Sequence, residues 1–225
     1  MLINAEFSCR AALAPEHYQW VQSPQNGVER VMLDRVGAEK ARATSIVRYA
    51  PESNFPHHLH PGGEEILVLS GTFSADNSDY PAGWYLRNPP TSGHQPYSHE
   101  GAVIFVKLWQ MTVDETRHVA IDTNDADNWQ EQGGREVCHL YSDAKEQVIL
   151  QRINAGEALF TGIIVGGAEL LVLEGTLIEA GQSYQRGGWI RLPVDAISQI
   201  TAGENGATVY LKTGHLSQII GIDVH

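Results

Sequence analysis

The sequence repeats itself once, at a spacing of about a hundred residues. Residues 166–176 read GGAELLVLEGT and align with residues 62–72, GGEEILVLSGT, at an offset of 104. Further along the two copies, Gly188-Trp189 correspond to Gly83-Trp84, Arg191 to Arg87, Pro193 to Pro89 and Lys212 to Lys107. A repeat of this length is as long as a domain, so the sequence predicts two copies of one domain and not a solenoid of short units.

The first copy consists of short stretches of β-forming residues separated by Gly, Pro or Asn, and no stretch has a helical period. We expect strands at residues 28–33, 44–49, 65–69, 72–74 and 84–86. The longest apolar run, residues 102–111, suits a buried central strand. Many short strands at regular spacing predict an all-β sandwich or barrel.

A polar and acidic stretch separates the two copies. Residues 122–128 read DTNDADN, and Gly133-Gly134 follow. Such a stretch is typical of a solvated linker. We therefore expect an N-terminal arm at residues 1–20, a first domain at 21–112, a linker at 113–134 and a second domain at 135–225.

Charge and composition exclude several classes of partner. The net charge of −12 argues against binding of a nucleic-acid backbone, which requires clustered Lys and Arg. No run of 18 apolar residues could cross a bilayer, and the N-terminus has no signal-peptide core, so no membrane contact is expected. Cys9 and Cys138 stand alone and predict no disulfide framework. These features indicate a cytoplasmic protein with reduced thiols.

Residues 56–71 of the first copy gather side chains that bind metals. If residues 54–60 are extended, His58 and His60 lie on one face while His57 points away. The turn at residues 61–63, Pro-Gly-Gly, reverses the chain, and Glu64 then begins the next strand beside the two histidines. Two imidazoles and a carboxylate on one face are ligands that suit a divalent transition metal.

The spacing H-x-H-x3-E-x6-G that begins at His58 resembles the first motif of the cupin family, in which two His and one Glu bind a metal inside a small β-barrel. The family pattern places this Glu seven residues before a Gly, which selects Glu64 over Glu65. The second cupin motif has a His after a P-x-G turn. Here residues 81–83 form that turn, and His94 is the next histidine, at a longer spacing than the general pattern.

The resemblance implies two tandem cupin domains, each a jelly-roll or double-stranded β-helix. It also implies one metal in the first domain, held by His58, His60, Glu64 and His94. We expect His57 and His99 to be exposed to solvent instead of binding the metal, because His57 has the wrong parity and His99 lies in a turn.

Four short sequence motifs point to one particular group of cupins. HPGGEE, YPAG, RNPP and IFVKLWQM make the chain similar to the cupin-like domain of ChrR-type anti-sigma factors. This similarity implies a ligand- or oxidant-sensing regulatory module, linked to stress-response transcription, with a small molecule as its partner. The chain lacks the H-x3-C-x2-C zinc motif of the helical segment in ChrR that looks responsible for holding the sigma factor, so direct sigma-factor contact is not expected. A homodimer is an open alternative.

The second copy helps to separate metal ligands from structural residues. At the offset of 104, the four expected ligands are all replaced, whereas Glu65 persists as Glu169. The replacements of His58, His60, Glu64 and His94 are Gly162, Ile164, Ala168 and Ser198. Four residues that bind one metal together are expected to be replaced together in a copy that does not bind it. We therefore expect a second domain without a metal and a structural role for Glu65.

Three His and one Glu, without Cys, suit Zn, Fe(II), Mn, Ni or Cu. We expect one divalent metal per chain, with zinc first and iron, manganese or nickel as alternatives, and no organic cofactor.

A closed four-coordinate zinc favours a structural or sensing role. A six-coordinate ion favours a non-haem dioxygenase acting on aryl ketones or diketones, as in related cupins. A storage or purely structural double cupin is the third alternative. The sequence leaves open whether the protein is an enzyme, and the catalytic residues are not identified.

Overall fold

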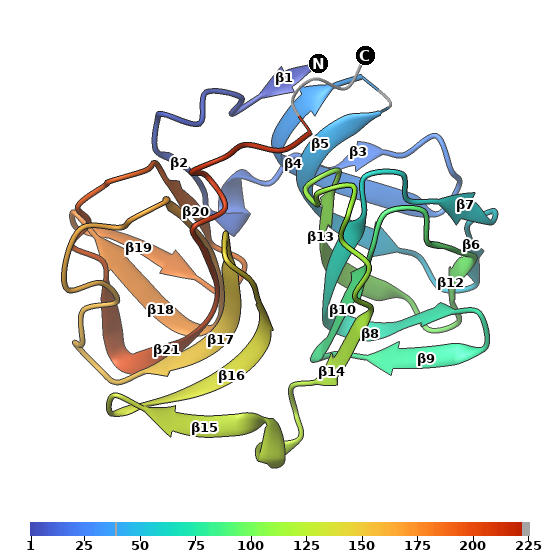
Figure 1. The fold of residues 1–225 in the computed structure, drawn as a ribbon. Coiled ribbons are helices and arrows are strands. Elements are labelled where there is room, and N and C mark those ends of the chain that lie inside the picture. Colours follow the sequence, from blue (N-terminus) through green and yellow to red (C-terminus); the bar gives the residue numbers. More distant parts are fainter. Residues whose placement is uncertain (39, 222–225) are drawn as a thin grey trace. The chain divides into compact units, whose positions relative to one another are not determined.

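The computed structural model describes residues 1–38 and 40–221 of the chain, almost all of them in strands and connecting loops (Figure 1). The helical segments in this part are two short 3-10 turns, η1 (Pro15–His17) and η2 (Ala126–Asn128). The expectation of an all-β fold is confirmed. Across the same residues, no helix has the length and apolar character required to span a bilayer.

The chain divides into two compact units. Unit 1 contains Met1–Ala5, Gln19–Asn124 and residues 220–221, whereas unit 2 contains Glu6–Tyr18 and Asp125–Ile219. Unit 1 is built on an antiparallel sheet with the strand order β1-β4-β5-β13-β8-β10-β14. The bounds of these strands are β1 (Leu2–Ile3), β4 (Val28–Gly37), β5 (Ala41–Tyr49), β13 (Ala102–Leu108), β8 (Glu64–Ala75), β10 (Trp84–Asn88) and β14 (Val119–Asp122).

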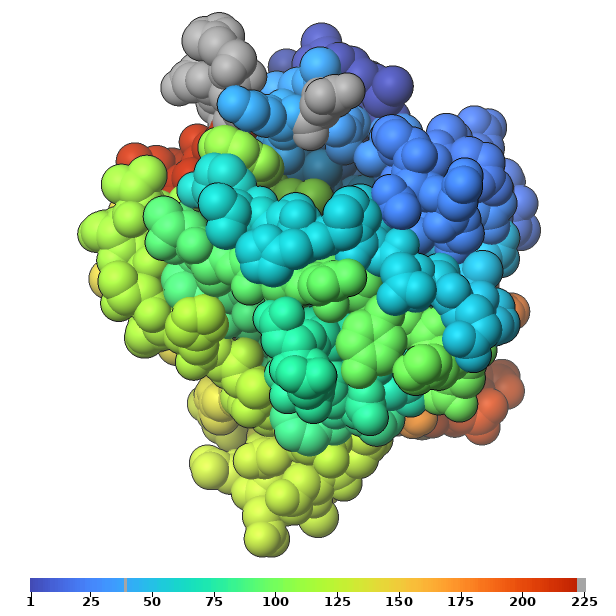
Figure 2. All heavy atoms as spheres, turned by 90° about the vertical axis from the view of Figure 1, so that its right-hand side faces the viewer, coloured from blue at the N-terminus to red at the C-terminus, as the bar shows by residue number. Residues whose placement is uncertain are grey.

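Shorter strands complete unit 1. They are β3 (Val21–Gln22), β6 (Ser53–Asn54), β7 (His58–Leu59), β9 (Ser78–Pro81), β11 (Gly93–His94) and β12 (Pro96–Ser98). Of these, β7 and β11 form a separate two-stranded sheet, and the others belong to the main sheet, where β12 pairs with β6 and β8. Figure 2 shows one face of unit 1, on which the cyan segment of β6 and β7 lies beside the green segment of β11 and β12.

Most of the expected strands of the first copy are present, with one difference in the middle. The expected strands at 65–69 and 72–74 are a single long strand, β8. A register shift against β13 lets β8 continue, because Val103 is opposite Ser70 while Ile104 is opposite Val68. Gly71 has a φ of 67°, and a Cβ there would lie 2.0 Å from the carbonyl oxygen of Gly101, so only glycine fits this crossing.

The alternation of β8 decides which side chains face the interior of unit 1. Ile66 and Val68 are buried in its hydrophobic core together with Leu86 of β10 and Val106 of β13. Side chains two residues apart on a strand share a face, so Glu64 lies on this inner face. Glu65 therefore lies on the opposite face of the sheet.

Unit 2 repeats this arrangement with the strand order β15-β16-β17-β21-β18-β20-β2. Its interior is a continuous apolar core that includes Ile164, Ala168 and Leu192. The strand bounds are β15 (Trp129–Gln132), β16 (Arg135–Ser142), β17 (Gln147–Ile153), β21 (Thr201–Thr213), β18 (Ala168–Glu179), β20 (Trp189–Leu192) and β2 (Ala11–Leu13), with β19 (Gln182–Gln185) paired to β18.

Each unit contains a strand from the segment that precedes the other sequence copy. β2 precedes the first copy but pairs with β20 in unit 2, with Leu13 opposite Trp189. β14 precedes the second copy but pairs with β10 in unit 1, with Trp84 opposite Asp122. Residues 6–18 of the expected arm thus belong to unit 2, and residues 113–124 of the expected linker belong to unit 1.

The ladders confirm the internal repeat and correct one detail of it. Glu65 is opposite Arg87 in unit 1, as Glu169 is opposite Arg191 in unit 2. The sequence comparison paired Trp189 with Trp84, but this pairing is wrong by one residue. Trp189 is opposite Leu171 and Tyr85 is opposite Leu67, so Trp189 takes the place of Tyr85. Both of these side chains are fully buried, whereas Trp84 is only half-buried.

Candidate metal centre

The structure brings the four expected ligands together. One donor atom from each of His58, His60, Glu64 and His94 can be chosen so that all four lie within 4.8 Å of one another. The imidazole centroids of His60 and His94 are 4.5 Å apart, and that of His58 lies 4.9 Å and 5.1 Å from them. No other group of three or more metal-binding side chains is gathered in the part of the chain that the structure describes.

Strand register places these side chains. β7 pairs with β11 so that His58 is directly opposite His94. His60 follows β7 outside any strand, where its backbone N–H donates to the carbonyl of Ser92 over 2.8 Å. The extended segment expected at residues 54–60 is therefore interrupted, but His60 still points toward the cluster. Glu64, the first residue of β8, completes the group.

The distances match those expected of ligands that share one ion. The Oε2 atom of Glu64 lies 3.4 Å from Nε2 of His60 and 3.5 Å from Nε2 of His94. Two donors bound at about 2.1 Å to one metal are separated by about 3.0 Å at a right angle and about 3.4 Å at the tetrahedral angle. A first-row divalent ion therefore fits between these three atoms.

Hydrogen bonds to the Nδ1 atoms turn the Nε2 atoms toward the centre. Nδ1 of His58 lies 3.1 Å from the carbonyl oxygen of Pro56, and Nδ1 of His60 lies 3.3 Å from Oγ of Ser92. A proton on Nδ1 can be donated to these oxygens, which leaves Nε2 as a free lone pair for a metal. Nε2 of His60 is buried and has no hydrogen-bond partner among the described residues, as expected of an atom that binds a cation.

Burial gives the histidines the protonation state that metals require. It lowers the pKa of His60 to about 3, and the neighbouring His94, His58 and His57 lower it further in the same direction. Burial lowers the pKa of His94 to about 4, again with support from His58 and His57. Both imidazoles are therefore neutral at pH 7, and neutral imidazole is the form that coordinates metals.

Burial shifts the pKa of the Glu64 carboxyl group in the opposite direction. Its burial raises its pKa to about 7, although a hydrogen bond from Asn88 acts to lower the pKa. A buried carboxylate without a cation is unfavourable, and a divalent ion at bonding distance would compensate for the lost hydration. The donor set and its charge thus fit a divalent metal.

Aromatic rings flank the histidines. Phe55 lies 5.1 Å from His58 and Phe73 lies 5.8 Å from His94, measured between ring centroids. Tyr49 in turn packs edge-on against Phe73 at 5.8 Å. Of the four expected ligands, His58 is half-buried while the others are buried, so His58 is on the side of the centre nearest to solvent.

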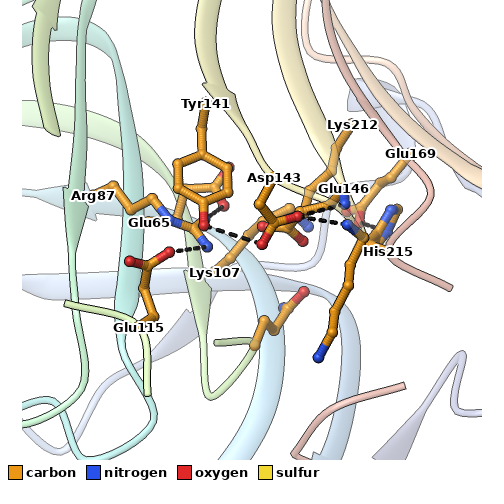
Figure 3. A network of polar contacts seen from close by, with 12 residues as sticks. Glu65, Arg87, Lys107, Glu115, Tyr141, Asp143, Glu146, Glu169, Lys212 and His215 are labelled. Atoms are coloured by element: carbon orange, nitrogen blue, oxygen red, sulfur yellow. Dashed lines mark hydrogen bonds and ion pairs between the residues drawn. The ribbon is translucent and has the colours of Figure 1, made fainter. Parts of the chain in front are cut away.

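The remaining candidates lie elsewhere. Glu65 is buried on the opposite face of the sheet, where its Oε2 lies 3.1 Å from Nη1 of Arg87. Figure 3 shows Arg87 with its two carboxylate neighbours, Glu65 and Glu115, the latter at 3.9 Å. His57 and His99 are exposed, as expected.

In unit 2 the corresponding positions contain apolar or uncharged residues. Ile164 and Ala168 are buried in its core, Gly162 is exposed, and Oγ of Ser198 donates to Glu179 over 2.9 Å. Unit 2 has its own buried polar contacts on the outer face of its sheet, where Nζ of Lys212 lies 3.1 Å from Glu146 (Figure 3).

Sequence reasoning missed Asn88 and Ser92, which contact two of the expected ligands. Nδ2 of Asn88 donates to Oε2 of Glu64 over 3.2 Å, and Ser92 contacts His60. Neither residue belongs to the motif that identified the ligands. The internal repeat contains a signal for both, because the second copy replaces them by Leu192 and Ala196.

The turn between His60 and Glu64 depends on Gly62. A Cβ at Gly62 would lie 2.6 Å from the indole ring of Trp109 and 2.7 Å from its Cα atom. We expect Gly62→Ala to lower the free energy of unfolding by about 1–3 kcal/mol, because backbone and ring must both move. Thermal unfolding measures this loss. Gly162→Ala is the matched control, since nothing lies within 4 Å of a Cβ there, and an equal loss in both variants would contradict the packing argument.

The comparisons with known proteins agree with this fold. The model of the ChrR cupin-like domain family matches residues 8–112 and, a second time, residues 116–217. No curated protein sequence matches the chain. Among solved structures, one from Nostoc punctiforme that is provisionally named a dioxygenase has a TM-score of 0.71 at 13% identity, over 97% of this chain and 84% of that chain.

Two further structures have the same architecture. The bacterial pirin YhhW from Escherichia coli, in complex with nickel(II), has a TM-score of 0.68 at 11% identity, over 91% of this chain and 98% of that chain. A cupin 2 conserved barrel domain protein from Leptotrichia buccalis has a TM-score of 0.59 at 13% identity, over 86% and 92%. At these identities the structural similarity shows the fold alone. Because the family model covers most of both copies, the chain belongs to the ChrR cupin-like domain family and is a double cupin.

Proposed function

We propose that unit 1 binds one divalent metal ion through His58, His60, Glu64 and His94, and that this centre makes the protein a regulatory sensor of a small ligand or oxidant. The observation that carries the proposal is the convergence of four donor atoms within 4.8 Å in a buried setting. Zinc is the first candidate, with iron, manganese and nickel as alternatives. The nickel(II) complex of the similarly folded pirin supports the inclusion of nickel.

A bound ion would supply Lewis acidity and, where it takes more than four ligands, a coordination position for an incoming ligand. The protein's own residues prepare that position. His60 and His94 stay neutral at pH 7 because they are buried. Phe55 and Phe73 present apolar rings beside the histidines and exclude water from that side. The half-buried His58 marks the side from which a small molecule approaches.

The neutral surroundings favour sensing over acid–base catalysis. The four ligands are flanked by side chains without a titratable group, namely Phe55, Phe73, Asn88 and Ser92. The group with a pKa of about 7 is Glu64, which is itself one of the expected ligands and would be occupied by the ion. Burial, together with the charge of Glu64, raises the pKa of Tyr49, so this phenol also stays neutral. General acid–base catalysis needs a group with a pKa near the working pH, within hydrogen-bond reach of the reacting atoms.

A second candidate is a metal-dependent dioxygenase acting on aryl ketones or diketones. The aromatic flank is the observation that favours it, because Phe55 and Phe73 are placed to pack against an aryl group bound beside the histidines. Such a reaction draws its chemistry from the ion and dioxygen, and it does not require a separate protein acid or base.

Purification without added metal, followed by elemental analysis, tests the metal centre. We expect about one ion per chain, and two ions per chain, or none after incubation with Zn, Fe, Mn and Ni, would contradict the proposal. Oxygen uptake on a panel of aryl ketones and diketones separates the two candidates. A sensor is expected to keep its ion and to show no substrate-dependent oxygen uptake. Substrate-dependent oxygen uptake would establish the dioxygenase instead.

A further inference from the structure

We propose that Asn88 and Ser92 are positioning residues of the metal centre, which hold Glu64 and His60 in the orientation that binds the ion. This inference rests on the proposed metal-binding function and extends it from the four ligands to the groups behind them. The expected consequence is that Asn88 and Ser92 set the affinity for the metal without touching it.

Asn88 controls the direction of the Glu64 carboxylate. It is the last residue of β10 and lies directly opposite Glu64 in the ladder with β8. Its Nδ2 atom donates to Oε2, the same oxygen that lies 3.4 Å and 3.5 Å from the Nε2 atoms of His60 and His94. The amide therefore holds the oxygen that faces the histidines and restricts rotation of the carboxylate.

Ser92 controls the ring of His60. Its Oγ atom lies 3.3 Å from Nδ1, and its backbone carbonyl accepts the N–H of the same histidine over 2.8 Å. When Nε2 binds a metal, Nδ1 carries the proton and donates it to the hydroxyl oxygen. The serine thus favours one tautomer and one ring orientation, which is the usual role of a partner behind a metal-bound histidine.

Unit 2 shows that the backbone does not need the serine hydroxyl. There the N–H of Ile164 donates to the carbonyl of Ala196 over 2.9 Å, the same backbone contact that joins His60 to Ser92. Unit 2 has neither the histidine nor the hydroxyl at these positions, yet the backbone hydrogen bond is present. The hydroxyl of Ser92 is therefore not required to build this part of the fold.

The same comparison applies to the amide of Asn88. In unit 2, Ala168 is opposite Leu192 at the register positions of Glu64 and Asn88. Both replacements are buried in the apolar core. The hydrogen-bonding side chains of Asn88 and Ser92 are thus replaced together with the four ligands, while the ladder at Asn88 and the backbone hydrogen bond at Ser92 have counterparts in unit 2. That pattern is expected of residues that serve the site.

The test uses the residues that unit 2 already contains at these positions, Asn88→Leu and Ser92→Ala, because the corresponding backbone of unit 2 accommodates them. Affinity for Co(II) and Zn(II) is measured by competition with a chelator, and the visible absorption of bound Co(II) reports the coordination geometry. We expect each variant to bind about 10–100-fold more weakly than the unmodified chain. We also expect a shifted Co(II) spectrum in each variant, and Ser92→Thr, which retains the hydroxyl, to restore the affinity.

Ser98→Ala is the matched control. Ser98 is buried and its Oγ donates to the backbone carbonyl of Thr72 over 2.7 Å, so its loss should lower the melting temperature and leave the metal affinity unchanged. Unchanged affinity in both Asn88→Leu and Ser92→Ala would overturn the inference, as would equal weakening by Ser92→Ala and Ser92→Thr. Failure of the unmodified chain to bind Co(II) or Zn(II) would instead overturn the proposed function.

Discussion

Replacing Glu64 by Gln is expected to lower the metal content from about one ion per chain toward zero. The substitution removes the only charged ligand and leaves a neutral amide oxygen, while three neutral imidazoles remain. His60→Ala should have the same effect, because it removes a ligand whose Nε2 atom is 3.4 Å from the carboxylate. Elemental analysis of the purified variants measures both losses, and full occupancy in either variant would show that the assigned ligand set is wrong.

The same substitution should stabilise the metal-free protein at alkaline pH. Burial raises the pKa of Glu64 from 4.5 to about 7, so the folded state binds the carboxyl proton of Glu64 more tightly than the unfolded state does. The stabilisation is fully present below pH 4.5 and is lost as the pH rises through 7. At pH 8 we expect the free energy of unfolding of metal-free Glu64→Gln to be higher than that of the metal-free unmodified chain by on the order of 3 kcal/mol. Denaturant unfolding measures this difference.

Glu65→Gln is the matched control for this experiment. Glu65 points to the other face of the sheet and is paired with the buried Arg87 at 3.1 Å. Its replacement should leave the metal in place and lower the free energy of unfolding by about 1–3 kcal/mol, because Arg87 loses a charged partner. If Glu65→Gln loses the metal and Glu64→Gln keeps it, the register of β8 has been assigned one residue out of step.

A chain cut once after Val113 is expected to stay in one piece and to retain its metal. Val113 is 92% exposed, so a protease site can be inserted there without disturbing a strand. After cleavage, the N-terminal fragment still supplies β2 to unit 2, and the C-terminal fragment still supplies β14 to unit 1. Each fragment therefore contributes hydrogen-bonded strand pairs to the unit that is mainly built from the other.

Expressed separately, the same two fragments should not reach a stable fold, because each lacks a strand that pairs at the edge of its sheet. Size-exclusion chromatography and metal analysis of the cleaved protein test the first expectation, and thermal unfolding of each fragment tests the second. We call β2 and β14 the exchanged strands, because each pairs in the unit that is mainly built from the other fragment. Separation of the fragments under native conditions, or cooperative unfolding of residues 1–113 alone, would contradict the importance of these strands.

The expected ligand positions could be nominated from the sequence because coordination chemistry restricts residue type and spacing at once. Three of the four nominated residues, His58, His60 and Glu64, lie within seven residues of one another. His94 is distant in the sequence, and only the pairing of β7 with β11 explains why it lies opposite His58. The apolar run that contains β13 likewise predicted a central strand, since a long β-branched and aliphatic stretch suits burial on both faces.

The exchanged strands could not be predicted in the same way. β2 is the three-residue segment Ala11–Leu13 and has no alternating pattern, so its sequence does not indicate which sheet it joins. Its partner, β20, begins more than 170 residues further on. Asn88 and Ser92 were overlooked for a different reason. An amide and a hydroxyl have no metal-binding signature of their own, and their importance emerges only from the hydrogen bonds they make.

The apolar interior of unit 2 has a consequence for the lifetime of the protein in a cell. Ile164, Ala168 and Leu192 stabilise unit 2 by apolar burial, whereas unit 1 contains buried imidazoles and a carboxylate that would gain stability from a bound ion. A chain made during metal shortage is therefore weakened in one unit only. Cellular proteases act on locally unfolded segments, so we expect the steady-state abundance of the protein to follow the supply of its ion.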